Sequence, residues 1–191
     1  TFADVALWNE RSVTVTEFAE PERVDAIAAT FRLLPMLGVQ PQVGRGFEEQ
    51  DNANGGPEVV MLSHGYWQRR FGGNREVIGR TIQMDGWGSV VVGVLPPTFR
   101  IYLPADAAMP TNVDAWGVLP RNISDFARDA AWLTVVTRLR DGVTLEQAQQ
   151  RIQYARDQLV AAERKARDAD KREKAAYRQI ELAQQRLDEA Q

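Results

Sequence analysis

Alternating hydrophobic and polar positions mark the first part of the chain. Residues 5–18 (VALWNERSVTVTEF) contain two short strand-like runs, and in the second Val13 and Val15 alternate with threonines. This period of two is typical of a strand with one buried face. After Pro21, the apolar run VDAIAATF within residues 20–32 predicts a further strand.

The middle of the chain places short apolar runs between turn residues, and this pattern predicts strands that surround single helices. Two of the strands are expected to form a hairpin around residues 85–88. Residues 96–112 are expected to form an irregular connection. The fold class predicted is α+β, with mixed small sheets and a few packed helices. The expected strands are Val59–Leu62, Thr81–Met84, Val90–Leu95, Asp114–Leu119 and Trp132–Leu139.

Two short helices are predicted in this part of the chain. The first covers Leu33–Leu37 and ends at Gly38. The second begins after Ser63, whose hydroxyl can cap a helix N-terminus, and runs to about Phe71, before a Gly-Gly-Asn turn. Residues 51–57 (DNANGGP) are expected to form a turn-rich surface segment.

The C-terminal part of the chain has the pattern of one long helix. Thr144 and Gln147 form a capping-box pair, and no glycine or proline follows before Gln191. With Leu145 at heptad position a, every d position is alanine, seven times in succession, which is the spacing of a coiled-coil seam. The a positions are Leu145, Ile152, Leu159, Ala166, Glu173, Ile180 and Leu187, and the d positions are Ala148, Ala155, Ala162, Ala169, Ala176, Ala183 and Ala190.

This helix would extend roughly 69 Å at 1.5 Å per residue, longer than a compact domain of 150 residues. Alanine at d allows a partner helix to approach closely but buries little apolar area, and Glu173 weakens the seam further. Three arrangements stay open: a solvated helix, a helix that self-associates into a homodimer or docks on another helix, and a hairpin that folds back near residues 168–170. The predicted organisation is a core domain at 1–143 and a heptad helix at 144–191.

The composition narrows the function classes. A net charge of −3 gives no reason to expect a nucleic acid as partner. The chain has no cysteine, so disulfide frameworks, thiol catalysis and cysteine zinc sites are excluded. No apolar run of about 18 residues spans a bilayer, and no P-loop motif binds ATP.

No catalytic, cofactor-binding or metal-binding residues are predicted. His64, the only histidine, follows Ser63 directly, and adjacent residues on a helix point in different directions. The carboxylates at Asp4, 48–49 and Asp51 have no catalytic or calcium-loop spacing and are interpreted as solvated loop acids.

The aromatic residues are interpreted as parts of the fold. Trp67 and Phe71, four residues apart, are expected to face the core while an arginine of the Arg69-Arg70 pair covers the edge. The remaining tryptophans are interpreted as core or edge residues rather than a sugar platform: Trp8, Trp87, Trp116 and Trp132.

Three segments together resemble the extracytoplasmic core domain of FtsX/MacB-type transporter permeases. They occur in family order over about residues 1–152, which makes the resemblance more specific than any one segment would. They are MLGVQPQVGRGFEEQDN (36–52), VVMLSHGYWQRRFGGNREVIGRTIQMDGWGSVVVGVLPPTF (59–99) and WLTVVTRLRDGVTLEQAQQRI (132–152).

The resemblance implies a periplasmic domain of an ABC transporter permease, a soluble fragment of a membrane protein at the outer face of the bacterial inner membrane. Its implied partners are the transmembrane segments of the parent permease, a cytoplasmic ATPase, and a periplasmic adaptor or hydrolase. In such permeases ATP hydrolysis drives rigid-body motion of the external domains. The alternative is a non-transporting scaffold or adaptor module that acts through the long helix. Residues 152–191 depart from the family pattern, in which return strands follow a shorter helix; their heptads are similar in composition to helical hairpins of periplasmic adaptors.

Overall fold

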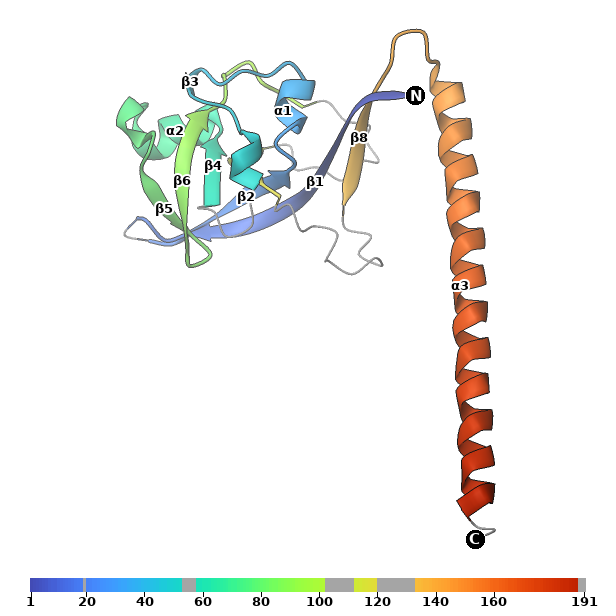
Figure 1. The fold of residues 1–191 in the computed structure, drawn as a ribbon. Helices are drawn as coiled ribbons and strands as arrows, with labels where there is room; N and C mark the ends of the chain where they lie inside the picture. Colours follow the sequence, from blue (N-terminus) through green and yellow to red (C-terminus); the bar gives the residue numbers. More distant parts are fainter. Residues whose placement is uncertain (19, 53–57, 102–111, 120–132, 189–191) are drawn as a thin grey trace. The chain divides into compact units, whose positions relative to one another are not determined.

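In the computed structural model, the strands of the described residues join in one mixed eight-stranded sheet (Figure 1). The structure describes residues 1–191 except 19, 53–57, 102–111, 120–132 and 189–191, and side chains are described up to residue 178. The residues form two compact units, Phe2–Arg138 and Leu139–Gln191 together with Thr1. The elements are β1 (Phe2–Val15), β2 (Glu22–Ala29), α1 (Leu33–Met36), β3 (Val43–Gly44), η1 (Glu49–Asn52), β4 (Glu58–Leu62), α2 (His64–Phe71), η2 (Arg75–Val77), β5 (Thr81–Met84), β6 (Trp87–Val94), β7 (Ala115–Val118), β8 (Thr134–Leu139) and α3 (Leu145–Asp188).

The α+β class predicted from the sequence is confirmed, but the strands form a single sheet rather than several small ones. The strand order is β2-β7-β4-β6-β5-β1-β8, and β1 also pairs with β2, so six strands close into a ring. β2 pairs with β7 and β4 with β6 in parallel, whereas β1 with β2, β1 with β5, β3 with β6, β4 with β7 and β5 with β6 pair antiparallel. The two runs expected in residues 5–18 merge into β1, a strand of 14 residues.

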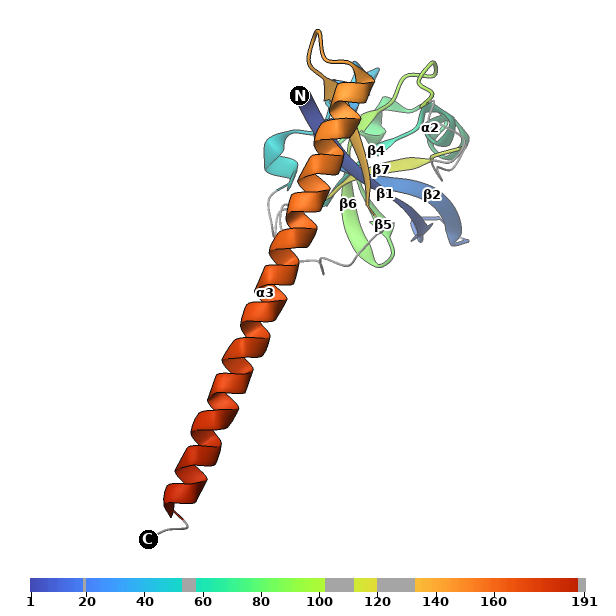
Figure 2. The ribbon, with the colours of Figure 1, turned by 90° about the vertical axis from the view of Figure 1, so that its right-hand side faces the viewer.

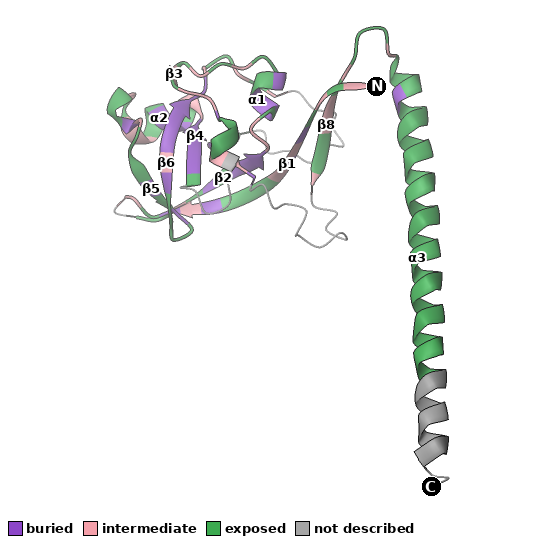
Figure 3. Ribbon diagram, in the orientation of Figure 1, coloured by how far each residue is buried: buried purple, intermediate pink, exposed green. Residues whose placement is uncertain are grey.

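Both faces of the sheet are buried at β4, and the two sides of this strand show why its sequence is continuously apolar. Val60 and Leu62 belong to one hydrophobic cluster with Tyr66 and Trp67 of α2. Val59 and Met61 point to the opposite side and belong to a second cluster, which includes the buried side chains of α1. A strand covered on both faces reads as an apolar run instead of an alternation. Figure 3 shows this burial along β4 and β6.

α2 begins and ends as its sequence predicts. The Ser63 hydroxyl accepts a hydrogen bond from the backbone N–H of Tyr66 at 3.1 Å. At the other end, Gly72 adopts the left-handed conformation with φ 60°, which glycine reaches without steric cost.

The hairpin of β5 and β6 is tighter than expected, since only Asp85 and Gly86 form its turn. Both residues have positive φ, 50° and 83°, which is the geometry of a two-residue type I′ turn. The Asp85 carboxylate accepts a hydrogen bond from the backbone N–H of Thr14 at 2.7 Å, and the Asp85 N–H donates to the Thr14 carbonyl at 2.9 Å. The turn is therefore tied to β1.

α3 is one helix of 44 residues, which Figure 2 shows without a break. The predicted capping box is present: the Gln147 N–H donates to Thr144 Oγ1 at 3.2 Å, and the Thr144 N–H donates to Gln147 Oε1 at 3.1 Å. The alternative of a hairpin near residues 168–170 is wrong, because the helix continues through them. Within the described part of the chain, no helix combines the length and hydropathy of a membrane span.

Candidate functional site

The Ser63-His64 pair takes part in folding contacts that separate its two side chains. Ser63 caps α2, as described above. Nδ1 of His64 accepts a hydrogen bond from Nε2 of Gln42 at 2.6 Å, and the same amide donates to the Leu95 carbonyl at 3.0 Å. The imidazole also contacts the Trp67 ring edge-on, with centroids 5.7 Å apart. His64 thus ties α2 to the segment before β3 rather than acting on Ser63.

The acidic residues before β4 include one that is not solvated, which corrects the prediction for Asp51. Its side chain is 6% exposed and accepts two hydrogen bonds from the Arg45 guanidinium at 2.6 and 2.9 Å. The Glu48 backbone N–H donates a third at 2.8 Å. Burial on its own would raise the pKa of the Asp51 carboxyl, but these hydrogen bonds outweigh it and lower the pKa.

A cavity of about 490 Å³ lies beside this loop. Its apolar lining comes from α1 and the residues around it and from Phe47. Around this lining, Arg32 lies 3.7 Å from the Asp4 carboxylate, and the Arg138 guanidinium donates to the Met36 carbonyl. The cavity is within the size range of small-molecule sites, and its rim carries charges of both signs. It is lined by Asp4, Phe31, Arg32, Pro35, Met36, Phe47, Glu48, Glu49 and Arg138.

The basic and aromatic segment of α2 packs as predicted. Trp67 is buried, Phe71 packs against the same cluster, and the Arg70 guanidinium lies 4.6 Å above the Phe18 ring. Arg70 also forms an ion pair with the carboxylate of Glu22. Because this arginine is bound to an acid and a ring of the same domain, it covers the edge of the core instead of presenting a free cation.

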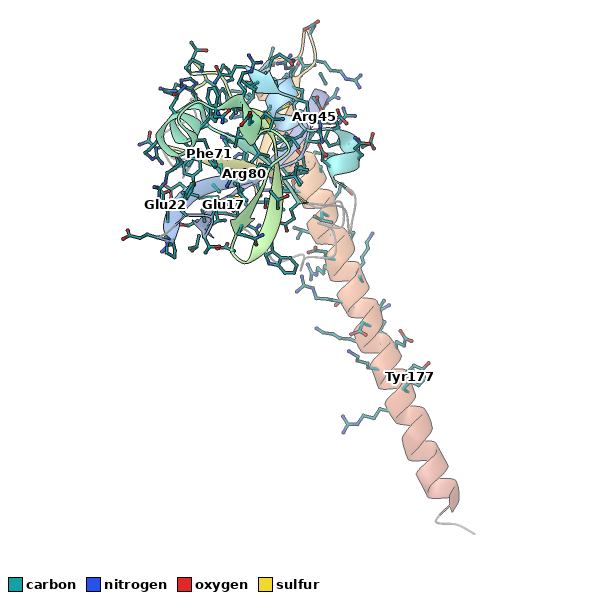
Figure 4. The ribbon with its side chains drawn as sticks, turned by 90° about the vertical axis from the view of Figure 1, so that its left-hand side faces the viewer. Glu17, Glu22, Arg45, Phe71, Arg80 and Tyr177 are labelled. Carbon is teal, nitrogen blue, oxygen red and sulfur yellow. The ribbon has the colours of Figure 1, made fainter. Side chains whose placement is uncertain are left out.

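A second arginine repeats this arrangement on the neighbouring side of Phe71. Arg80 lies 6.0 Å from the Phe71 ring centroid and 2.5 Å from the Glu17 carboxylate. Figure 4 shows Glu17, Phe71 and Arg80 in one region of the domain. A cavity of about 320 Å³ lies among these side chains. It is lined by Phe18, Arg70, Phe71, Asn74, Glu76, Val77 and Arg80.

A third set of ion pairs joins α2 to β2 and to Asp114, the residue just before β7. Arg69 lies 3.0 Å from the Asp114 carboxylate and 3.8 Å from that of Glu22. Burial raises the pKa of the Asp114 carboxyl, and Arg69 opposes the rise. Burial likewise raises the pKa of the Tyr66 phenol to about 12, with the Glu22 charge adding to it. The buried phenol therefore stays neutral at physiological pH.

The tryptophans separate into buried and exposed positions. Trp8 and Trp116 lie in the second cluster, as expected of core residues. Trp87 starts β6 at the hairpin turn and is 68% exposed. Trp132 lies outside the described residues. In the described part of the chain, no group of three or more His, Cys, Asp or Glu side chains could hold a metal ion.

Comparisons with known proteins give one consistent result. A family model described as the MacB-like periplasmic core domain matches residues 2–155. No curated protein matches the chain. The fold is similar to the crystal structure of the periplasmic region of MacB from Actinobacillus actinomycetemcomitans, with a TM-score of 0.56 and 14% identity over 83% of this chain and 67% of that one.

Two further solved structures share the fold. The extracellular domain of the ABC-type transporter YknZ from Gram-positive bacteria has a TM-score of 0.54 and 15% identity, over 78% of this chain and 70% of that one. A domain of a putative permease protein from Porphyromonas gingivalis has a TM-score of 0.53 and 16% identity, over 82% and 64%. The chain therefore spans about two thirds of the length of these structures.

Proposed function

Because the chain belongs to the family of MacB-like periplasmic core domains, we propose that it transmits conformational change in an ABC transporter permease. The expected place of the domain, outside the membrane on its periplasmic side, is confirmed by the family match. The family is one of transporters rather than enzymes. The proposal goes further: ATP hydrolysis by a cytoplasmic partner moves this domain as a body, and the motion serves export or acts on a periplasmic partner.

One observation carries the proposal. The chain enters and leaves the sheet at neighbouring positions, because the carbonyl of Thr1, just before β1, accepts a hydrogen bond from the N–H of Arg140, just after β8, at 3.1 Å. β1 and β8 are also neighbours in the sheet. Neighbouring entry and exit positions in the sheet are compatible with a domain carried between two membrane segments, since both of its connections return to the same membrane surface.

The sheet is built to move without deforming. β1 pairs with β2 over eight residue pairs, from Trp8–Ala29 to Val15–Glu22. β1 is also part of the ring of six strands. A displacement of β1 is therefore passed on to the neighbouring strands, because closely packed interiors transmit strain. We infer that a force applied to β1 moves the whole sheet.

The experiment is a distance measurement in the full permease that carries this domain, reconstituted with its ATPase. Since these 191 residues contain no cysteine, Gln83→Cys gives one spin-label site within this domain, exposed and in the regular strand β5; cysteines elsewhere in the permease are replaced first. The expected result is a change in the label-to-label distance between two permease copies when ATP replaces ADP. Identical distance distributions in the two nucleotide states would contradict transmission by rigid-body motion.

The structure gives a specific observation in favour of a second candidate, a scaffold that works through α3. Its described side chains from 149 to 178 are all exposed, including large apolar ones, so the helix presents a surface to a partner. Deletion of residues 155–191 separates the two candidates. The scaffold predicts that partner binding disappears in the truncated chain, whereas the transmission function predicts that the sheet still folds and the nucleotide-dependent distance change persists.

A further inference from the structure

We propose that β8 is a strap, meaning a strand that leaves the sheet in a local opening while the other strands stay folded, and that Arg138 holds it in place. Motion then enters the domain through β1 and not through β8. The release of β8 is a property of the chain alone, whereas the role of β1 rests on the proposed transmission of motion.

β8 contributes little to the core of the domain. None of its six residues is buried, and Val135 is 57% exposed. Each strand of the six-stranded ring, by contrast, has at least two buried residues. Figure 3 shows this difference between β8 and β4. Detachment of β8 therefore exposes little new apolar surface, and a local opening that exposes little apolar surface costs little free energy.

The position of β8 in the sheet also allows it to leave alone. It lies at the end of the strand order and is joined to the sheet through β1. When β8 leaves, β1 keeps its eight residue pairs with β2, from Trp8–Ala29 to Val15–Glu22, and its pairing with β5. The ring of six strands therefore stays closed, and the hydrogen bonds lost from the sheet are those between β1 and β8.

Two side chains of β8 contact other parts of the same compact unit. Val136 is partly buried against the second hydrophobic cluster. The Arg138 guanidinium donates a hydrogen bond to the carbonyl of Met36, the last residue of α1. The last carbonyls of a helix have no partner within the helix, so Arg138 satisfies a group that α1 leaves open. Hydrogen bonds from a charged donor are stronger than neutral ones, and we expect the loss of this one to favour opening.

The unequal attachment of β1 and β8 gives the transmission of motion a preferred entry. β1 has buried residues along its length, including Ala6, Trp8 and Val15, so a displacement of β1 has to carry the ring with it. A displacement of the chain that follows β8 instead opens β8 first, because that opening disturbs less of the core. The two ends of the domain are neighbours in the sheet but differ in stiffness.

The first experiment is hydrogen exchange followed by NMR on the 191-residue chain, at urea concentrations below the unfolding transition. The slowest amides of β8 should exchange at least about tenfold faster than the slowest amides of β2. Their exchange should also depend only weakly on urea, since a local opening exposes little surface. Equal rates and an equal urea dependence in the two strands would mean that β8 opens only with the whole sheet, and would overturn the proposal.

The second experiment repeats the measurement with Arg138→Met, which keeps a long apolar stem but has no donor. Exchange in β8 should become about fivefold faster, which corresponds to one net hydrogen bond of about 1 kcal/mol, while β2 stays unchanged. Arg138→Lys keeps a donor and should lie between. The matched control is Arg100→Met, because the Arg100 guanidinium donates to carbonyls of its own loop, those of Pro97 and Phe99. Unchanged β8 exchange in Arg138→Met, or equal acceleration in β2, would overturn the role of Arg138.

The third experiment tests the entry of motion in the full permease that carries the spin label at Gln83→Cys. Arg138→Met should leave the change in label-to-label distance between ADP and ATP intact, because β1 is unaffected. If the change is present in the unmodified permease and lost in Arg138→Met, β8 carries the motion and the role of β1 is wrong. If the change is absent from both, the transmission function fails and the role of β1 with it, while the exchange rates still decide whether β8 is released.

Discussion

The close approach of β3 to β6 provides a sharp test of the packing of the sheet. A Cβ atom added at Gly93 in β6 would lie 2.4 Å from the Arg45 carbonyl oxygen and 3.1 Å from Cε of Met61. The first contact is with backbone, and the Arg45 N–H is itself bonded to the Val92 carbonyl at 2.8 Å. The chain after β3 therefore cannot yield to Gly93→Ala without giving up hydrogen bonds to β6.

The expected loss follows from this geometry. Overpacking a well-packed site costs typically about 1–3 kcal/mol, and a displaced backbone hydrogen bond adds about 1 kcal/mol. We expect Gly93→Ala to lower the free energy of unfolding by about 2–4 kcal/mol, a large part of the roughly 5–15 kcal/mol that stabilises a domain.

The matched control is Gly117→Ala in β7, where the added Cβ would meet nothing within 4 Å. This change should be neutral or stabilise the domain by up to about 1 kcal/mol, because it restricts the unfolded chain. Urea unfolding followed by tryptophan fluorescence measures both variants, since Trp8 and Trp116 are buried. Equal stability of Gly93→Ala and the unmodified chain would refute the reasoning, as it would mean that the segment at Arg45 moves freely.

Three further changes test single contacts. Ser63→Ala removes the cap of α2 and should cost about 1 kcal/mol in urea unfolding, while Thr81→Ala on the exposed side of β5 serves as a surface reference. Asp51→Asn should cost about 1–2 kcal/mol at neutral pH, an amount that allows for the partial exposure of Arg45. Because the folded pKa of Asp51 is lowered, its contribution is present above the unfolded pKa and is lost as the pH falls through the folded one, so the two chains should converge in acid; a constant difference down to low pH would contradict this. Trp87→Ala should change stability by less than about 0.5 kcal/mol, because the indole is mostly exposed, and should remove a red-shifted part of the fluorescence spectrum.

Local features of the fold could be predicted because the residues that determine them are close in sequence. The cap at Ser63 and the left-handed Gly72 set both ends of α2, and Thr144 with Gln147 sets the start of α3. The caps at Ser63 and Thr144 each join a side chain to a backbone group three residues away, and Gly72 acts through its own backbone conformation. Short apolar runs between turn residues, and one period-two pattern in β1, located most of the described strands within a few residues for the same reason.

Long-range features could not be predicted in this way. The sheet joins β2 to β7, and β4 to β6, in parallel, and such registers depend on packing between strands that are distant in sequence. β3 has two residues and too little pattern to be recognised. The sequence does not predict the burial of Asp51, because an acidic residue in a turn-rich segment is usually solvated. The fold places the Arg45 guanidinium next to its carboxylate.

Several residues in the segments that resemble the permease family stabilise the fold of the domain. In the segment at 36–52, Gly44 lets the chain approach β6, Phe47 is buried, and Arg45 binds Asp51. In the segment at 132–152, Gly142 takes a φ of 78° and Thr144 caps α3. The residues discussed in these segments therefore fix backbone paths and joints instead of forming a reactive centre. A joint of this kind, at the crossing of β3 with β6, fits the proposed transmission of motion, because displacement is passed on only where the connections between elements are stiff.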